Sequence, residues 1–278
     1  MNQSLPPGLY IVATPIGNLG DVTARAAETL CRVDRILAED KRVTAKLLAH
    51  LGATAPMTAY HDHSDDDLRQ RILAEAAVKA IALVSDAGTP LISDPGYKLV
   101  RSARAAGIAV HTLPGPCAAI AALTLAGLPT DRFLFMGFLP AKAKARRDTI
   151  IEVAGIRASL IFYESGPRLV DSLAALADGL GQRDAAIIRE ISKLHEECVT
   201  GSLAELAGRY GEVPPRGEIV IVVGPPPEQV AATDDDLDAA LRTALAHMSP
   251  SRAAADVAAA LGIPKKRAYA RALALAAA

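Results

Sequence analysis

Four short segments of the sequence combine glycine, proline and small polar residues in a way that suits ligand binding. They are residues 14–18, 85–94, 114–118 and 163–165. Each follows an apolar run typical of a buried strand, and open α/β sheets bind ligands where strands end and helices begin. Small residues let the backbone approach a ligand, and helix N-termini provide free N–H donors. One such segment could be an ordinary turn, but four together indicate a small-molecule site.

The chain lacks the fingerprints of the common phosphate-binding and hydrolase folds. It contains no GxGxxG, GxxxxGKS/T or GxSxG sequence. The first two motifs hold nucleotide phosphates and the third presents a nucleophilic serine. The ligand of the four segments is therefore expected to be something other than a pyrophosphate.

Two charged segments have both a chemical and a structural interpretation. His61 and His63 would share one face of an extended segment, as two metal ligands do. Ser64 and the acidic run 65–67 form a good N-cap for a following helix, so a histidine facing a substrate is favoured and no metal is expected. Residues 39–42, Glu-Asp-Lys-Arg, follow a predicted strand and suit either a solvated cluster or a functional role.

Two basic stretches stand out from a chain that is otherwise nearly neutral. Residues 140–147 include Lys142, Lys144, Arg146 and Arg147. The tail, residues 249–278, has a single acid, Asp256, and the basic residues Arg252, Lys265, Lys266, Arg267 and Arg271. The tail predicts a helix, a Gly-Ile-Pro turn and a second helix that opens with the basic cluster, a spacing like that of a helix-turn-helix. Either stretch could be a solvated face, but the pair favours a nucleic-acid substrate.

The elements that must position these residues are alternating strands and helices. Apolar runs at 9–12, 35–38, 80–84 and 108–111 are each followed by a helical pattern, and further runs lie at 133–136, 160–163, 185–188 and 219–223. Unbroken apolar strands that alternate with helices predict an α/β fold with mostly parallel sheets covered on both faces. We expect two α/β domains, residues 1–127 and 128–227, and a small C-terminal helical appendage over 234–278.

Composition is that of a folded protein in a reducing compartment. Of 278 residues, 51% are hydrophobic and 22% charged, with a net charge of −1, which excludes wholesale disorder and a polyanion-binding surface over the whole molecule. Cys31, Cys117 and Cys198 lie far apart and form no CxxC pair. Residues 105–130 carry no charged side chain, but prolines at 114 and 116 divide them, and a helix of about twelve residues spans only about 18 Å. No secretory signal is recognised, so we expect a soluble, cytoplasmic protein.

Taken together, the motifs resemble one family of enzymes. The sequences carrying the resemblance are LYIVATPIGNL (9–19), AED (38–40), HDH (61–63), SDAGTP (85–90), DPGY (94–97), PGPCAA (114–119), GFLP (137–140) and FYES (162–165). They are similar to bacterial methyltransferases that act on the 2′-oxygen of a decoding-centre cytidine in small-subunit ribosomal RNA. These enzymes belong to the tetrapyrrole methylase-like (class III) superfamily, whose methyl donor is S-adenosylmethionine. The resemblance covers the whole chain and implies a homodimer that acts on the small ribosomal subunit.

The resemblance also implies roles for individual residues. The cofactor would contact six residues: Pro15, Asp86, Thr89, Cys117, Ala118 and Tyr163. Leu91 and Ile92 would provide apolar walls for its adenine. The sequence itself offers Asp40, His63 and Glu164, at expected strand ends, as candidates for the base that activates the ribose hydroxyl. Candidate RNA contacts are Arg42, Lys142, Lys144, Arg146, Arg147 and Arg168, with Lys265, Lys266, Arg267 and Arg271 of the tail. The segment Gly166-Pro167-Arg168 departs from the family pattern before its arginine, which puts only the local loop shape in doubt.

Two other functions are compatible with these residues. A methyltransferase of the same superfamily could act on a tetrapyrrole, although such an enzyme would not need a basic tail, and its first loop is typically glycine-rich. A regulator could sense a small ligand and bind nucleic acid through the tail. Methyl transfer to RNA distinguishes the proposed enzyme from both.

Overall fold

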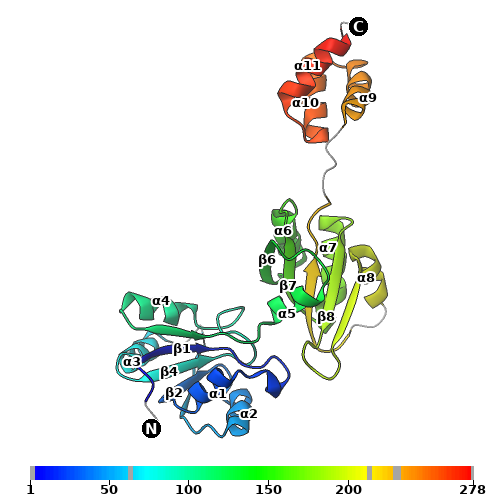
Figure 1. The fold of residues 1–278 in the computed structure, drawn as a ribbon. Coiled ribbons are helices and arrows are strands. Elements are labelled where there is room, and N and C mark those ends of the chain that lie inside the picture. Colours follow the sequence, from blue (N-terminus) through cyan, green and yellow to red (C-terminus); the bar gives the residue numbers. More distant parts are fainter. Residues whose placement is uncertain (1–3, 62–64, 212–214, 228–232, 277–278) are drawn as a thin grey trace. The chain divides into compact units, whose positions relative to one another are not determined.

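The structure is a computed structural model that describes residues 4–61, 65–211, 215–227 and 233–276. The chain divides into two compact units, Met1–Pro226 and Pro227–Ala278. The first unit contains both β-sheets, and the described part of the second is helical (Figure 1).

The first sheet is parallel throughout. Its strands lie in the order β3-β2-β4-β1-β5, and each pair of neighbours runs in the same direction. Its strands are β1 (Gly8–Val12), β2 (Arg35–Ala38), β3 (Met57–Ala59), β4 (Ala80–Val84) and β5 (Val110–Leu113). Every residue of β4 is buried. This burial confirms the interpretation of unbroken apolar runs as strands covered on both faces.

Four helices supply that cover. One apolar cluster joins one face of the sheet to α1 (Ala24–Leu30) and α2 (Lys41–Leu51), and a second joins the other face to α3 (Asp66–Ala76) and α4 (Tyr97–Ala105). The short 3-10 helix η1 (Leu19–Asp21) precedes α1. Each strand of this sheet is followed in the chain by one of these helices or by α5 (Ala118–Leu125).

The second sheet has helices on both faces. Its strands are β6 (Phe133–Phe138), β7 (Ser159–Ser165), β8 (Asp184–Arg189), β9 (Glu197–Ser202) and β10 (Glu218–Val223). One apolar cluster packs it against three helices: α6 (Ala143–Val153), α7 (Gly166–Leu180) and α8 (Leu203–Tyr210). A separate cluster packs α5, which follows the first sheet in the chain, against the opposite face.

The direction of the strands in the second sheet differs from the expectation of mostly parallel sheets. The order is β6-β7-β10-β8-β9, and only β6 and β7 pair in parallel, whereas the other three pairings are antiparallel. The sequence pattern missed β9 because Glu197–Ser202 is a half-exposed edge strand with polar residues and a glycine. A short loop connects β8 to β9, which permits an antiparallel pair without a crossover helix.

The second unit is a small bundle of α9 (Asp234–Leu245), α10 (Pro250–Leu261) and α11 (Lys265–Ala276). Its core contains leucines, alanines and a valine, whose small volumes let the helices approach closely. Gly262 ends α10 in the left-handed conformation, with φ +63°, and a short turn leads into α11. The predicted helix, turn and helix of the tail are confirmed.

The apolar stretch 105–130 is divided as predicted, with the short helix α5 in its second half. Within the described residues, no helix is long and apolar enough to cross a membrane. The predicted boundary at residue 127 falls between α5 and β6, inside the first compact unit, so the three-part division stays a prediction.

Candidate functional site

A cavity of about 360 Å³ is lined by loops that follow strands of the first sheet and by residues of the second sheet. The volume is in the range of small-molecule sites, roughly 300–1,000 Å³. Five residues singled out from the sequence line it: Thr89, Cys117, Ala118, Tyr163 and Glu164. The expected wall residue Ile92 also lines the cavity, whereas Leu91 does not.

Backbone hydrogen bonds bring the first three predicted segments together. The Thr14 N–H donates to the Gly88 carbonyl at 2.8 Å, and the Gly88 N–H donates back to the Thr14 carbonyl at 3.0 Å. Gly88 has φ +80°, which favours glycine. The Thr89 hydroxyl donates to the Pro116 carbonyl at 2.9 Å. These contacts bind the loops after β1, β4 and β5 into one wall.

Tyr163 joins the fourth segment to this wall. It lies on β7, and its phenolic oxygen accepts a hydrogen bond of 3.2 Å from the backbone N–H of Ala119, in the first turn of α5. Burial raises the pKa of the Tyr163 phenol to about 12, helped by the nearby Cys117 thiol. Tyr163 is therefore a neutral, positioned part of the cavity at any physiological pH.

Pro15 and Asp86 do not line the cavity, although their chain neighbours Ile16 and Ala87 do. One carboxylate oxygen of Asp86 accepts the backbone N–H of Asp40 at 2.9 Å. The bond connects the loop after β4 to the loop after β2. Asp86 is thus placed to hold the shape of the site.

Asp94 lines the cavity, and the sequence analysis did not assign it a role. Two residues with positive φ precede it in the chain, Leu91 at +75° and Ser93 at +64°, a conformation that is costly for residues with a side chain. Burial raises the pKa of the Asp94 carboxyl to about 6, and the carboxylates of Glu39 and Asp86 add to the rise while the Ser85 hydroxyl opposes it. The sequence signal for Asp94 was its place at the end of the long 85–94 loop.

The structure argues against Asp40 as the base. Its carboxylate accepts the Arg42 N–H at 2.8 Å, which caps α2, and binds the Arg42 guanidinium at 2.6 Å. These bonds lower the pKa of Asp40 to about 2. A carboxylate with so low a pKa is a weak proton acceptor at neutral pH.

The buried Glu164 carboxylate has a structural role and is not free to act as a base. Its carboxylate accepts the Ser172 hydroxyl at 2.5 Å and the Ser165 N–H at 2.9 Å, and the Arg168 guanidinium lies 3.5 Å away. The contacts with Ser172 and Arg168 hold α7 to the end of β7. The third candidate, His63, lies outside the described residues.

The predicted RNA contacts in and near α6 and α7 fall into two groups. The Arg146 side chain is largely buried and lies 3.9 Å from Asp171, so little of its guanidinium is available for a phosphate contact. Arg168 donates to the Leu139 carbonyl and pairs with Glu164, which makes it mainly structural. In the described part of the chain, no hydrogen bond or ion pair engages the three remaining cations near α6, all of which are exposed: Lys142, Lys144 and Arg147.

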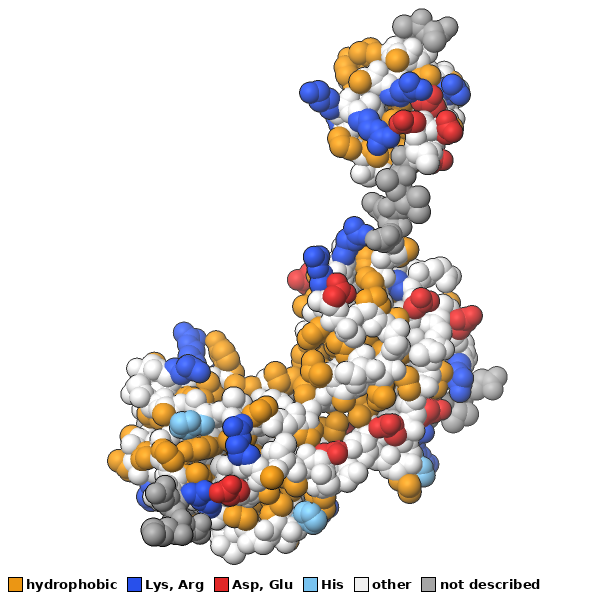
Figure 2. Space-filling model, viewed as in Figure 1, with side chains coloured by type: hydrophobic (Ala, Val, Ile, Leu, Met, Phe, Trp, Pro, Cys, Tyr) orange, Lys and Arg blue, Asp and Glu red, His pale blue; other side chains and the backbone are white. Residues whose placement is uncertain are grey.

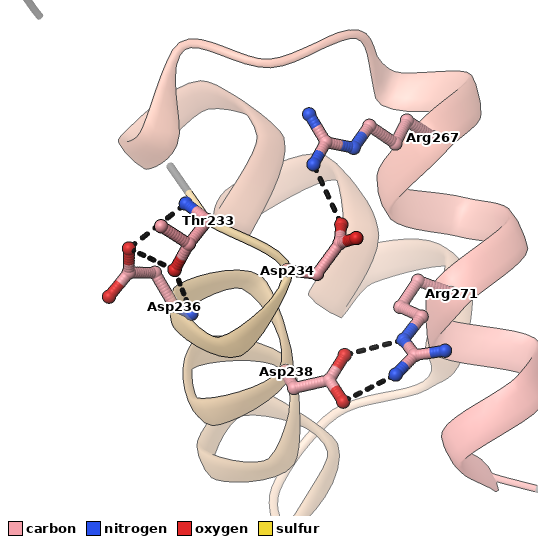
Figure 3. A network of polar contacts seen from close by, with 6 residues as sticks. All are labelled: Thr233, Asp234, Asp236, Asp238, Arg267 and Arg271. Atoms are coloured by element: carbon pink, nitrogen blue, oxygen red, sulfur yellow. Dashed lines mark hydrogen bonds and ion pairs between the residues drawn. The ribbon is translucent and has the colours of Figure 1, made fainter. Parts of the chain in front are cut away.

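In the helical unit, too, some basic residues are held in ion pairs (Figure 3), and others are exposed. Arg271 binds Asp238 through two hydrogen bonds of 2.5 and 2.6 Å, and Arg267 binds Asp234 at 2.8 Å. These pairs attach α11 to α9. Lys265 and Lys266 are exposed, and no contact within the described residues engages their ammonium groups. Figure 2 shows Lys and Arg side chains beside acidic ones on this unit.

Comparisons with known proteins agree with this architecture. Residues 8–207 match the Tetrapyrrole (Corrin/Porphyrin) Methylases, and residues 231–276 match the RsmI C-terminal HTH domain. A protein of Erythrobacter litoralis named ribosomal RNA small subunit methyltransferase I is 58% identical, over 98% of this chain and 97% of its own length. The protein of that name from Escherichia coli O157:H7 is 48% identical, over 95% and 94%.

Solved structures share the fold at lower identity. A diphthine synthase aligns with a TM-score of 0.62 at 14% identity, over 78% of this chain and 89% of that one. The uroporphyrin-III-C-methyltransferase of Thermus thermophilus aligns with a TM-score of 0.56 at 22% identity, over 79% and 94%. The chain belongs to the tetrapyrrole (corrin/porphyrin) methylase family. It is an S-adenosylmethionine-dependent methyltransferase of that family.

The lining of the cavity fits this cofactor. S-adenosylmethionine carries a positive sulfonium, a positive ammonium and an adenine ring, and it has no phosphate. No Lys or Arg is found among the described residues that line the cavity, whereas three acidic residues do line it: Asp94, Glu164 beside Arg168, and Glu218 paired with Lys193. Ile16, Ile92 and Ile191 provide apolar walls. Such a site attracts a cationic ligand with an apolar ring and disfavours a nucleotide phosphate.

Proposed function

We propose that this protein methylates the 2′-oxygen of a cytidine ribose in the decoding centre of small-subunit ribosomal RNA. The observation that carries the proposal is the identity of about half of the residues to relatives named ribosomal RNA small subunit methyltransferase I, over nearly the full length of both chains and with the helical unit included. A tetrapyrrole substrate would leave the second unit without a purpose. The exposed lysines of α11 suit an RNA backbone.

The cofactor would be held by the residues at the ends of the strands. Thr89, Cys117, Ala118 and Tyr163 border the cavity and would contact it directly. Pro15 and Asp86 stand one residue away from the lining and would shape the loops that do so. When bound, S-adenosylmethionine supplies a methyl group on a positively charged sulfur.

Asp94 is our choice for the residue that accepts the proton of the ribose hydroxyl. It faces the cavity, and a carboxyl with a pKa of about 6 is ionised at neutral pH yet basic enough to take a proton. Asp40 is too weakly basic and Glu164 is committed to structural bonds. The cavity walls would also orient the ribose hydroxyl, and this orientation would account for much of the remaining rate acceleration.

RNA would be bound by exposed cations of both units, namely Arg42, Lys142, Lys144, Arg147, Lys265 and Lys266. Arg267 and Arg271 would position α11 for these contacts. We further propose that the protein acts in the cytoplasm as a homodimer on the assembled small subunit, where folded RNA presents the nucleotide. Residues 1–127, 128–227 and 234–278 would be its three domains.

A radiolabelled methyl-transfer assay tests this function. The acceptors are small ribosomal subunits and naked RNA from cells that lack the enzyme, with a uroporphyrinogen-type tetrapyrrole alongside. We expect label in small-subunit RNA, recovered in an alkali-resistant dinucleotide because a 2′-O-methyl group blocks cleavage by the neighbouring hydroxyl. Label in the tetrapyrrole alone would overturn the substrate. Tight cofactor binding without transfer to any acceptor would favour a regulator.

A further inference from the structure

The end of strand β6 contains a bulge that turns Phe138 toward the cavity. The register between β6 and β7 shifts between Phe135 and Gly137, where Gly137 has φ +64°. Residues three apart on a regular strand point to opposite faces of the sheet. Here the rings of Phe135 and Phe138 both contact Tyr163, with centroids 4.9 and 5.6 Å from its ring. The extra residue of the bulge therefore brings Phe138 to the same face as Tyr163.

Phe138 lines the cavity and is also 56% exposed. Tyr163 meets it edge to face, at an interplanar angle of 67°. An exposed phenyl ring loses the free energy that burial would provide, so a bulge that holds the ring at a ligand site needs a compensating role. Phe133, at the other end of the same strand, is 46% exposed but does not line the cavity.

Exposed cations follow Phe138 closely in the chain. Lys142 precedes the first residue of α6, and Lys144 and Arg147 lie three residues apart on the exposed side of this helix. An aromatic ring for stacking beside cations for phosphates is the combination by which proteins bind unpaired nucleotides.

We propose that Phe138 is a base-stacking residue, which holds the nucleobase of the acceptor nucleotide at the mouth of the cavity while Lys142, Lys144 and Arg147 bind the neighbouring phosphates. The inference rests on the proposed function, because it requires an RNA acceptor. A stacked base would fix the ribose of the same nucleotide beside Asp94. Stacking selects an unpaired base of any sequence, so the residue contributes to affinity and orientation rather than to base identity.

The test compares Phe138→Leu with Phe138→Tyr and with the matched control Phe133→Leu. Methyl transfer to small ribosomal subunits is measured over a range of subunit concentrations, and S-adenosylhomocysteine binding is measured by calorimetry. We expect Phe138→Leu to raise KM for subunits about ten-fold, the loss expected from one stacked base. Phe138→Tyr and Phe133→Leu should stay within two-fold of the wild type, and the affinity for S-adenosylhomocysteine should not change.

Two other outcomes of this comparison count against the stacking role of Phe138. Equal KM values for Phe138→Leu and Phe133→Leu would overturn the stacking role, and so would weakened S-adenosylhomocysteine binding with an unchanged KM for subunits. If Phe138→Leu has a lower Tm than the wild type, Phe138→Met takes its place in the comparison. Methionine has a similar volume but no aromatic face, so this variant must show the same rise in KM. A wild-type protein that labels no ribosomal RNA would show that the proposed function is wrong, and the stacking role would fall with it.

Discussion

The phenolic oxygen of Tyr163 accepts the backbone N–H of Ala119 at 3.2 Å, and this bond joins the second sheet to the helix that follows the first sheet. Both residues stand beside the cavity wall formed by Cys117 and Ala118. A side chain from one sheet thus holds the loop of the other in place. The shape of the cavity therefore depends on this connection as well as on the residues that line it.

Tyr163→Phe should weaken cofactor binding. Removal of the hydroxyl leaves the Ala119 N–H without its partner, at a cost of about 1 kcal/mol or more in the free energy of unfolding, and it loosens the start of α5. We expect a several-fold higher Kd for S-adenosylhomocysteine by calorimetry. Tyr97→Phe, at an exposed position outside the cavity, is the control. Equal affinities of the two variants would show that the bond does not shape the site.

Asp86→Ala should abolish most methyl transfer without unfolding the protein. Its carboxylate ties the loop after β4 to the Asp40 N–H, and small misplacements of catalytic loops cost about a hundred-fold in rate. The measurement is kcat/KM together with thermal melting, with Asp131→Ala, an exposed loop residue, as the comparison. Normal activity of Asp86→Ala would mean that the cofactor loop is wrongly assigned.

Asp94→Asn should remove the acidic limb of the pH–rate profile. The wild-type rate should rise with pH through about 6, where Asp94 loses its proton and becomes a base, and then level off. The variant should be slower by at least about a hundred-fold and flat over the same range. The same slope in both proteins would exclude Asp94 as the proton acceptor.

Asp94→Asn should lower the reaction rate but raise the stability of the folded protein at high pH. The pKa of Asp94 is raised on folding, so the folded state binds the proton more tightly and the ionised carboxylate destabilises the fold above about pH 6. Asp94→Asn removes that charge. We expect a higher Tm than wild type at pH 8 and no such gain at about pH 3, below the pKa of both the folded and the unfolded state. A lower Tm at pH 8 would contradict the burial of the charge.

Glu164→Gln should act on stability more than on chemistry. The buried carboxylate loses its charge toward Arg168 and part of its bonding to Ser172, which costs about 1–3 kcal/mol in the free energy of unfolding. Urea unfolding measures this loss. The pH–rate profile should keep its shape, because Glu164 is not the base. A lost acidic limb in this variant, with Asp94→Asn unaffected, would reverse the two assignments.

Substitutions in the helical unit should separate the binding of small subunits from the stability of the fold. Lys265→Glu with Lys266→Glu should weaken binding to small subunits and reduce its salt dependence, because two phosphate contacts are lost, with no change in Tm. Asp238→Ala should instead speed hydrogen exchange in α9 and α11, because Arg271 loses its bidentate partner. A lower Tm in the lysine variant would show that these side chains have structural contacts.

Local pattern alone determined most of the first sheet and the tail. The strands at 35–38 and 80–84 were identified to the residue, because buried parallel strands are unbroken apolar runs. The turn at Gly262 was evident because a left-handed helix end favours glycine. The family resemblance of the motifs implied Thr89, Cys117, Ala118 and Tyr163 as cofactor contacts, and all four line the cavity.

Only the tertiary structure decided which charged groups are free to act. Asp40 and Asp94 are the same residue type at similar strand-end loops, but an arginine lowers the pKa of one and burial raises that of the other. Arg146 and Arg147 are adjacent in the sequence, and the helix buries one and exposes the other. The antiparallel second sheet and the bulge before Phe138 likewise depend on neighbours distant in the chain. Burial and partners are properties of the packed molecule, so no pattern within one segment could reveal them.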